Sequence, residues 1–157
     1  MSTPITILFA TTTGNAEDAA NTVAAKLKSA GFATNLVSAA NWTAPDVINF
    51  AAEPSTLLIV ASTWGEGEPP DDAIPLWDSL KEVEGTPLTN LRFSLLALGD
   101  HSYEIFCGFG VDLDARLEAL GATRISPRVD SDVDYDGPTQ DWCKEVLVAL
   151  SADLAAR

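Results

Sequence analysis

Three short segments rich in hydroxyl, amide, glycine and aromatic groups each follow an apolar run. They are residues 11–16 (TTTGNA), 62–70 (STWGEGEPP) and 98–104 (LGDHSYE), after the apolar runs 5–10, 56–61 and 93–97. Short apolar runs bounded by such segments are typical of buried parallel strands. Open parallel sheets bind ligands beyond the carboxyl ends of their strands, where the strand order reverses. The three segments are therefore predicted to contact one ligand.

The first segment joins a predicted strand to a predicted helix. Backbone N–H groups at a helix start carry partial positive charge and favour a phosphate. The hydroxyls of Thr11, Thr12 and Thr13 and the amide of Asn15 add neutral donors. The segment has no Lys or Arg and lacks both the P-loop lysine and the GxGxxG pattern. It therefore favours one terminal phosphate held by dipoles, with helix capping alone as the alternative.

Aromatic residues in the other two segments indicate a planar ligand. Trp64 and Tyr103 lie in loops that contain glycine, and a flat heterocycle between them would gain stacking contact. Gly65 can turn its peptide between conformations that other residues resist, although it can equally be a plain turn residue. Trp77 and Trp142 lie at apolar helical spacing and are predicted to be structural. Trp42 is assigned to surface or loop packing.

Other residues give weak signals for catalysis or metal binding. His101 is the single histidine and no Ser/His/Asp arrangement is readable, so we interpret it as an exposed loop residue. Cys107 has no evident base and is predicted to be packed. The pair Asp71-Asp72 is predicted to cap a helix. Alternating aspartates lack the EF-hand glycine and terminal glutamate, and indicate a solvated acidic loop; they are Asp130, Asp132, Asp134 and Asp136.

Strand and helix patterns alternate along the whole chain. The predicted strands are 5–10, 34–37, 56–61, 93–98 and 123–125, and the predicted helices are 16–30, 46–50, 74–83, 111–120 and 142–154. This alternation predicts an α/β fold of the flavodoxin-like, doubly wound type, with a five-stranded parallel sheet in the order 2-1-3-4-5 between two helical layers. We expect one domain over residues 1–157.

Composition limits the possible partners and the compartment. Nine Lys and Arg against 23 Asp and Glu give a formal charge of −14, which disfavours nucleic acid and acidic lipid surfaces. The acidic surface either serves solvation or attracts a partner with a basic face, and the residues leave both readings open. The sequence shows no membrane span and no secretory signal. Two cysteines without disulfide spacing fit a reduced, cytoplasmic protein.

Three motifs in order resemble a known family. The stretches TTTGNAEDAA, STWGEGEPPDDA and LALGDHSYEIFCGFGVDLDARLEALGATRI are similar to the flavodoxin-like FMN domain of diflavin reductases, and the resemblance is closest to the sulfite reductase flavoprotein. It extends from about Ile5 to Val148 and includes the tail RVDSDVDYDGPTQDW. The chain ends at Arg157, so we expect a free-standing short-chain flavodoxin, a group that includes the cindoxin type serving a haem-thiolate monooxygenase.

The resemblance implies FMN as cofactor and a set of site residues. The implied phosphate ligands are Thr11, Thr12, Thr13, Gly14, Asn15 and Ala16. The implied ring contacts are Ser62, Thr63, Trp64, Gly65 and Gly67 on one side and Leu98, Gly99, Asp100, Tyr103, Phe106 and Cys107 on the other. Relatives often have Tyr or Gln at the position of Trp64 and Asn at the position of Asp100. The carboxylate of Asp100 should oppose a negatively charged reduced ring.

The expected function is single-electron transfer rather than stand-alone catalysis. FMN would accept electrons from a separate FAD-containing, NAD(P)H-dependent flavoprotein reductase and pass them to a haem or iron–sulfur acceptor such as a cytochrome P-450. An acidic rim is expected to steer basic partners, formed by Glu66, Glu68, Asp71, Asp72 and Glu104. We expect a monomer. Two other function classes remain: a non-redox flavodoxin-like scaffold, and a flavin enzyme that reduces small substrates such as quinones.

Overall fold

The fold is described from a computed structural model that covers residues 5–11, 14–63, 67–100 and 107–156, with side chains up to residue 152. Its strands are β1 (Ile5–Ala10), β2 (Thr34–Ser38), β3 (Ser55–Ser62), β4 (Leu91–Leu98), β5 (Thr123–Arg124) and β6 (Val129–Ser131). Its α-helices are α1 (Asn15–Ser29), α2 (Ala44–Phe50), α3 (Ile74–Lys81), α4 (Gly108–Ala119) and α5 (Asp136–Ala156). Two 3-10 turns are η1 (Ala39–Asn41) and η2 (Asp71–Ala73).

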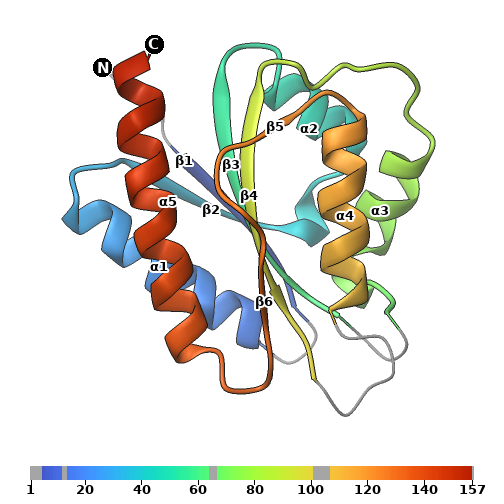
Figure 1. The fold of residues 1–157 in the computed structure, drawn as a ribbon. Coiled ribbons are helices and arrows are strands. Elements are labelled where there is room, and N and C mark those ends of the chain that lie inside the picture. Colours follow the sequence, from blue (N-terminus) through green and yellow to red (C-terminus); the bar gives the residue numbers. More distant parts are fainter. Residues whose placement is uncertain (1–4, 12–13, 64–66, 101–106, 157) are drawn as a thin grey trace.

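All strand pairs in the sheet are parallel, in the order β2-β1-β3-β4-β5, with β6 beside β4. Helices α1 and α5 cover one face, and α2, α3 and α4 cover the other (Figure 1). The predicted doubly wound, three-layer fold with its 2-1-3-4-5 order is therefore confirmed. Among the described residues, no helix has the length and apolar character needed to cross a bilayer.

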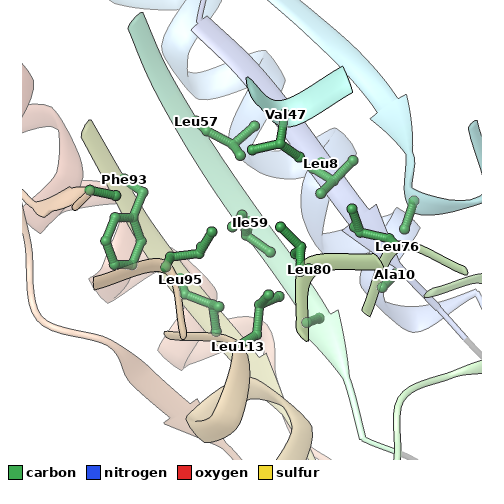
Figure 2. Packing of buried hydrophobic residues seen from close by; sticks show 14 of the residues in the cluster. Leu8, Ala10, Val47, Leu57, Ile59, Leu76, Leu80, Phe93, Leu95 and Leu113 are labelled. Atoms are coloured by element: carbon green, nitrogen blue, oxygen red, sulfur yellow. The ribbon is translucent and has the colours of Figure 1, made fainter. Parts of the chain in front are cut away.

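Strand alternation divides the core between the two faces. Ile7 belongs to the cluster beneath α1 and α5, whereas its neighbour Leu8 belongs to the cluster beneath α2, α3 and α4. Figure 2 shows the second cluster, in which Ile59 of β3 lies among leucines from both the sheet and the helices. Side chains on successive strand residues point to opposite faces, so a strand apolar at nearly every position supplies both cores.

The carboxy-terminal third differs from the sequence prediction. The strand predicted at 123–125 is observed as β5, which ends at Arg124. After a break, a further strand, β6, pairs with β4 through Leu96↔Val129 and Leu98↔Ser131. Asp130 therefore lies in a strand and not in a solvated loop. Helix α5 begins at Asp136, six residues before the predicted start. Its first turn contains Pro138, which does not interrupt the helix because a proline in the first turn removes no intrahelical hydrogen bond.

Just after β5 ends, a buried side chain donates a hydrogen bond to a backbone carbonyl outside the strands. The Trp142 Nε1–H donates to Ser94 Oγ at 2.9 Å, and the Ser94 hydroxyl donates to the Ser126 carbonyl at 3.1 Å. Trp142 is fully buried, so its predicted structural role is confirmed. Trp77 packs edge-on against Phe109, with ring centroids 5.6 Å apart, and also has a structural place. Trp42 packs beside Phe50, as expected for a loop-packing residue.

Candidate ligand-binding site at the strand ends

The carboxyl ends of β1, β3 and β4 meet at one edge of the sheet. Register pairs Ala10 with Ala61 and Ser62 with Leu98, so the three strands end within about one residue of one another. In Figure 1 these ends lie at the bottom of the sheet. The connection after β1 crosses one face and the connection after β2 crosses the other, which puts the reversal of strand order between β1 and β3. Ligands in open α/β sheets bind beyond the strands at such a point.

At the end of β1, the described residues form a turn that opens into helix α1. The Gly14 N–H donates to Thr11 Oγ1 at 2.8 Å, and Gly14 adopts a φ of +92°, which favours glycine. Asn15 is exposed, whereas the Ala16 side chain is fully buried, so Ala16 offers only its backbone. Thr12 and Thr13 lie outside the described residues. The first N–H groups of a 15-residue helix thus face the strand ends, as anion binding requires.

The first turn of α1 also carries two acidic residues, Glu17 and Asp18. The Tyr135 hydroxyl, which comes from the connection between β6 and α5, donates to Asp18 Oδ2 at 2.8 Å. Hydrogen bonding to this carboxylate raises the pKa of the Tyr135 phenol. The contact ties the first turn of α1 to a segment more than a hundred residues away, which local sequence patterns cannot reveal.

Beyond β3, the described residues are held by both of their neighbours. The Thr63 N–H donates to the Leu98 carbonyl at 3.0 Å, and Thr63 Oγ1 accepts from the Phe109 N–H at 3.2 Å. Ser62 and Thr63 are half-buried at the strand end, and Gly67 has a φ of +99°. Trp64, Gly65 and Glu66 lie outside the described residues. Thr63 therefore connects the second loop to the start of α4.

Beyond β4, Leu98 is buried while Gly99 and Asp100 are half-buried. Residues 101–106 lie outside the described residues, and with them the predicted positions of His101, Tyr103, Glu104 and Phe106. Cys107 precedes α4 and is fully buried, as predicted. Burial, together with the negative charge of Asp130, raises the pKa of the Cys107 thiol from 9.0 to about 12, so the group is a neutral thiol.

Of the predicted acidic rim, the described residues include Glu68, Asp71 and Asp72, whereas Glu66 and Glu104 lie outside them. Glu68, Asp71 and Asp72 are exposed. The predicted capping role of Asp71 and Asp72 is wrong: both lie inside η2, and neither η2 nor α3 has a side-chain cap. The pair precedes α3, but the residues at the two N-cap positions are Pro70 and Ala73.

Sequence reasoning missed Ser131, whose carbonyl accepts from the Gly99 N–H at 2.8 Å and contacts Cys107 Sγ at 3.6 Å. A signal was present in the sequence: residues 129–133 read VDSDV, with an aspartate at every second position, which is the period of a strand with one solvent-facing side. Interpreting the aspartates as a solvated acidic loop obscured that alternation. Within the described ranges, no group of three or more His, Cys, Asp or Glu side chains could hold a metal ion.

The donor set at the strand ends matches the chemistry of a phosphate monoester. It offers a helix N-terminus, a neutral hydroxyl and a positive-φ glycine, with space around Gly14 for close approach. The strand ends of β3 and β4 flank it with loops on the same edge.

Comparison with known proteins gives a consistent result. The family model described as Flavodoxin matches residues 7–144. The sulfite reductase [NADPH] flavoprotein alpha-component of Bacillus subtilis is 44% identical over 151 residues, which cover 96% of this chain and 24% of that protein. The Shewanella oneidensis protein of the same name is 44% identical over 93% of this chain and 23% of its own length. The chain thus spans about a quarter of these relatives.

Solved structures show the same architecture. A flavodoxin from Streptococcus pneumoniae has a TM-score of 0.80 and 24% identity, with 96% of this chain and 99% of that chain covered. A variant of flavodoxin from Pseudomonas aeruginosa has a TM-score of 0.77 and 27% identity, with 95% and 99% covered.

Proposed function

Because this chain belongs to the flavodoxin family, we propose that it is an electron carrier that exchanges single electrons through FMN bound at the carboxyl ends of β1, β3 and β4. Members of this family bind FMN, which when bound accepts and donates electrons one at a time. The observation that carries the proposal is the convergence of three strand ends with the α1 N-terminus on the edge where the strand order reverses.

The residues around α1 would hold the FMN phosphate. Thr11 and Gly14 flank the helix start, where neutral hydroxyls and backbone N–H groups can donate to an anion without a lysine. The proposed phosphate ligands are Thr11, Thr12, Thr13, Gly14, Asn15 and Ala16. The proposal assigns the ring system to the other two loops, with Trp64 and Tyr103 stacking on its faces. The remaining proposed contacts are Ser62, Thr63, Gly65, Gly67, Leu98, Gly99, Asp100, Phe106 and Cys107.

Redox partners are proposed from the chemistry of the relatives and the charge of this chain. The relatives are named as NADPH-dependent flavoproteins, which supports an FAD-containing, NAD(P)H-dependent reductase as electron donor. A haem or iron–sulfur protein, such as a cytochrome P-450, is the proposed acceptor. The proposed docking rim comprises Glu66, Glu68, Asp71, Asp72 and Glu104, and its negative charge favours partners with a basic face.

The central experiment measures flavin binding and reduction on purified apoprotein. Added FMN should bind with a flavin visible spectrum, and a potentiometric titration should resolve one-electron steps. A protein that stays colourless with FMN would instead support a non-redox scaffold. Rapid reduction of a quinone by NAD(P)H without an added reductase would support a flavin enzyme.

A substitution at the first loop tests the phosphate site. Thr11→Val should weaken FMN binding roughly tenfold or more, because a hydroxyl hydrogen bond to a charged group is lost. Riboflavin lacks the phosphate, so its affinity should change by less than about twofold. Thr22→Val is the matched control, since the Thr22 hydroxyl bonds only the Asp18 carbonyl of its own helix. Equal losses for FMN and riboflavin would contradict the assignment.

A further inference from the structure

One backbone oxygen holds both ends of the segment that joins β4 to α4. The Ser131 carbonyl of β6 accepts from the Gly99 N–H at 2.8 Å, and Cys107 Sγ lies 3.6 Å from the same oxygen. Sγ is also 3.5 Å from the Ala97 carbonyl, so its single S–H proton is shared between two acceptors. We call Gly99, Cys107 and Ser131 the clasp.

Close packing leaves little freedom at the clasp. A Cβ on Gly99 would lie 2.8 Å from Cys107 Sγ, closer than such atoms approach, and 3.0 Å from the Cys107 backbone nitrogen, which is a tight contact. Cys107 itself has a φ of +55°. Among the described residues, it is the single non-glycine residue with a positive φ. Backbone conformations of this kind persist where the surroundings fix them, and they cluster at ligand sites.

We propose that Cys107 is a positioning residue whose thiol, together with the Gly99 amide, is held by the Ser131 carbonyl. This arrangement fixes the third loop, which is the segment that joins β4 to α4, against the flavin ring. This inference rests on the proposed function for its ligand. It assigns the Cys107 side chain a role through the protein, and the proposed contact of Cys107 with FMN falls to its backbone, because the side chain is fully buried.

The chemistry of the surroundings suits a neutral donor. Sγ faces two carbonyl oxygens, and the nearby charges are those of Asp130, Asp132 and Arg128. A thiolate facing two carbonyl oxygens would have no proton to donate, whereas a thiol has one that the two carbonyls share. With its pKa raised to about 12, the thiol stays protonated at neutral pH.

The clasp also bears on the second loop. Two residues after Cys107, the Phe109 N–H donates to Thr63 Oγ1, and Thr63 follows β3. Fixing Cys107 against β6 therefore fixes the start of α4, which in turn holds the residue that opens the second loop. The clasp thus sets the spacing between Thr63 and Cys107, the described ends of the two loops proposed to enclose the ring.

The test compares two buried thiols. Cys107→Ala removes the clasp donor, while Cys143→Ala is the matched control, since Cys143 is equally buried on α5 in the other core cluster. Cys107→Ser restores a donor of similar size. We measure thermal unfolding of each apoprotein, the dissociation constants of FMN and riboflavin by fluorescence quenching, and hydrogen exchange of the Gly99 amide.

Cys107→Ala should weaken FMN and riboflavin alike, by about three- to tenfold, because the clasp holds the loop for the ring and not for the phosphate. It should also speed Gly99 amide exchange, and Cys107→Ser should recover most of both properties. Cys143→Ala should lower the unfolding temperature similarly and leave both flavin affinities within about twofold.

The inference is overturned if Cys107→Ala leaves ring affinity and Gly99 exchange unchanged, or if Cys143→Ala at equal stability weakens flavin binding as much. Failure of the proposed function looks different. In that case the wild-type protein binds neither flavin, whereas accelerated Gly99 exchange in Cys107→Ala alone still supports the clasp as the anchor of this loop.

Discussion

Cys107 illustrates how burial fixes the chemical state of a side chain. The folded protein raises the pKa of this thiol from 9.0 to about 12, with loss of solvation as the first cause. In the unfolded chain the thiol ionises near its ordinary value. A group whose pKa is raised by folding contributes stability that is complete below the unfolded pKa and is lost as pH rises toward the folded pKa.

Alkaline unfolding should therefore separate wild type from Cys107→Ala. Between pH 7 and 9 the stability difference should be constant. Above pH 9 the wild type should lose up to about 1.4 kcal/mol per pH unit relative to the variant. Urea unfolding at pH 8, 9, 10 and 10.5 measures this difference and cancels the titration of lysines and tyrosines common to both. A difference independent of pH would show that the thiol ionises as readily in the fold as in the unfolded chain.

At the scale of elements, the sequence predicts best where one element buries a regular stripe. The spacing of Ala19, Val23 and Leu27 predicts α1 to within a residue or two, and the buried run at 55–62 predicts β3. The order 2-1-3-4-5 follows from alternation and right-handed crossovers. The predicted starts of α4 and α5, at 111 and 142, fall after the observed starts at Gly108 and Asp136. Gly108, Gly137 and Pro138 indicate turns in isolation, although a helix tolerates them in its first turn.

Contacts between distant elements could not be predicted in this way. The candidate site residues were found because each follows an apolar run, but the ties that hold them come from Ser131, Phe109 and Tyr135, far away in the sequence. A polar residue in a short strand or loop gives no periodic signal of its partner. Local patterns thus predict where a ligand binds, while tertiary packing decides which residues support the site.

Asp114 joins α4 to both parts of the broken edge strand. Its carboxylate accepts from Arg124 Nε and Nη2 at 3.0 and 2.8 Å, and from Arg128 Nη1 at 3.1 Å. The Asp114 side chain is only 5% exposed. The hydrogen bond to Asp114 raises the pKa of Arg124, and Asp130 does the same for Arg128. Neither arginine can lose its charge, so removing the buried carboxylate leaves two cations without their shared partner.

Asp114→Ala should therefore lower the free energy of unfolding by about 2–4 kcal/mol. The matched control is Glu118→Ala on the same helix, because Glu118 also pairs with Arg124 but its side chain is 61% exposed. That change should cost less than about 1 kcal/mol. Chemical denaturation at low and moderate salt measures both. Equal costs for the two variants would mean that burial adds nothing to this ion pair.

For the whole molecule, charge is the property that acts at a distance. A formal charge of −14 on 157 residues produces a negative field that attracts a basic partner, and salt screens it within about 8–10 Å at ordinary ionic strength. Field strength near the strand ends should matter most for a partner that exchanges electrons there. Net charge alone would act equally from any part of the surface, so position and total charge can be separated by experiment.

Two triple variants make that separation. The first neutralises the exposed acids near the strand carboxyl ends, Glu68, Asp71 and Asp72, as Gln or Asn. The second neutralises exposed acids in the connections that lead into β3 and β4 at the opposite end of the sheet, Glu53, Glu82 and Glu84, as Gln. Each removes three negative charges, so total charge is matched and position differs.

With FMN bound, the rate of reduction by a flavoprotein reductase should fall about two- to tenfold in the first variant at low salt and change little in the second. The gap should close as ionic strength rises, because screening removes the steering from the wild type as well. Stopped-flow reduction over a salt series measures both rates. Equal losses in the two variants would assign the effect to net charge, and rates that do not vary with salt would remove electrostatic steering from the account of how this carrier meets its partner.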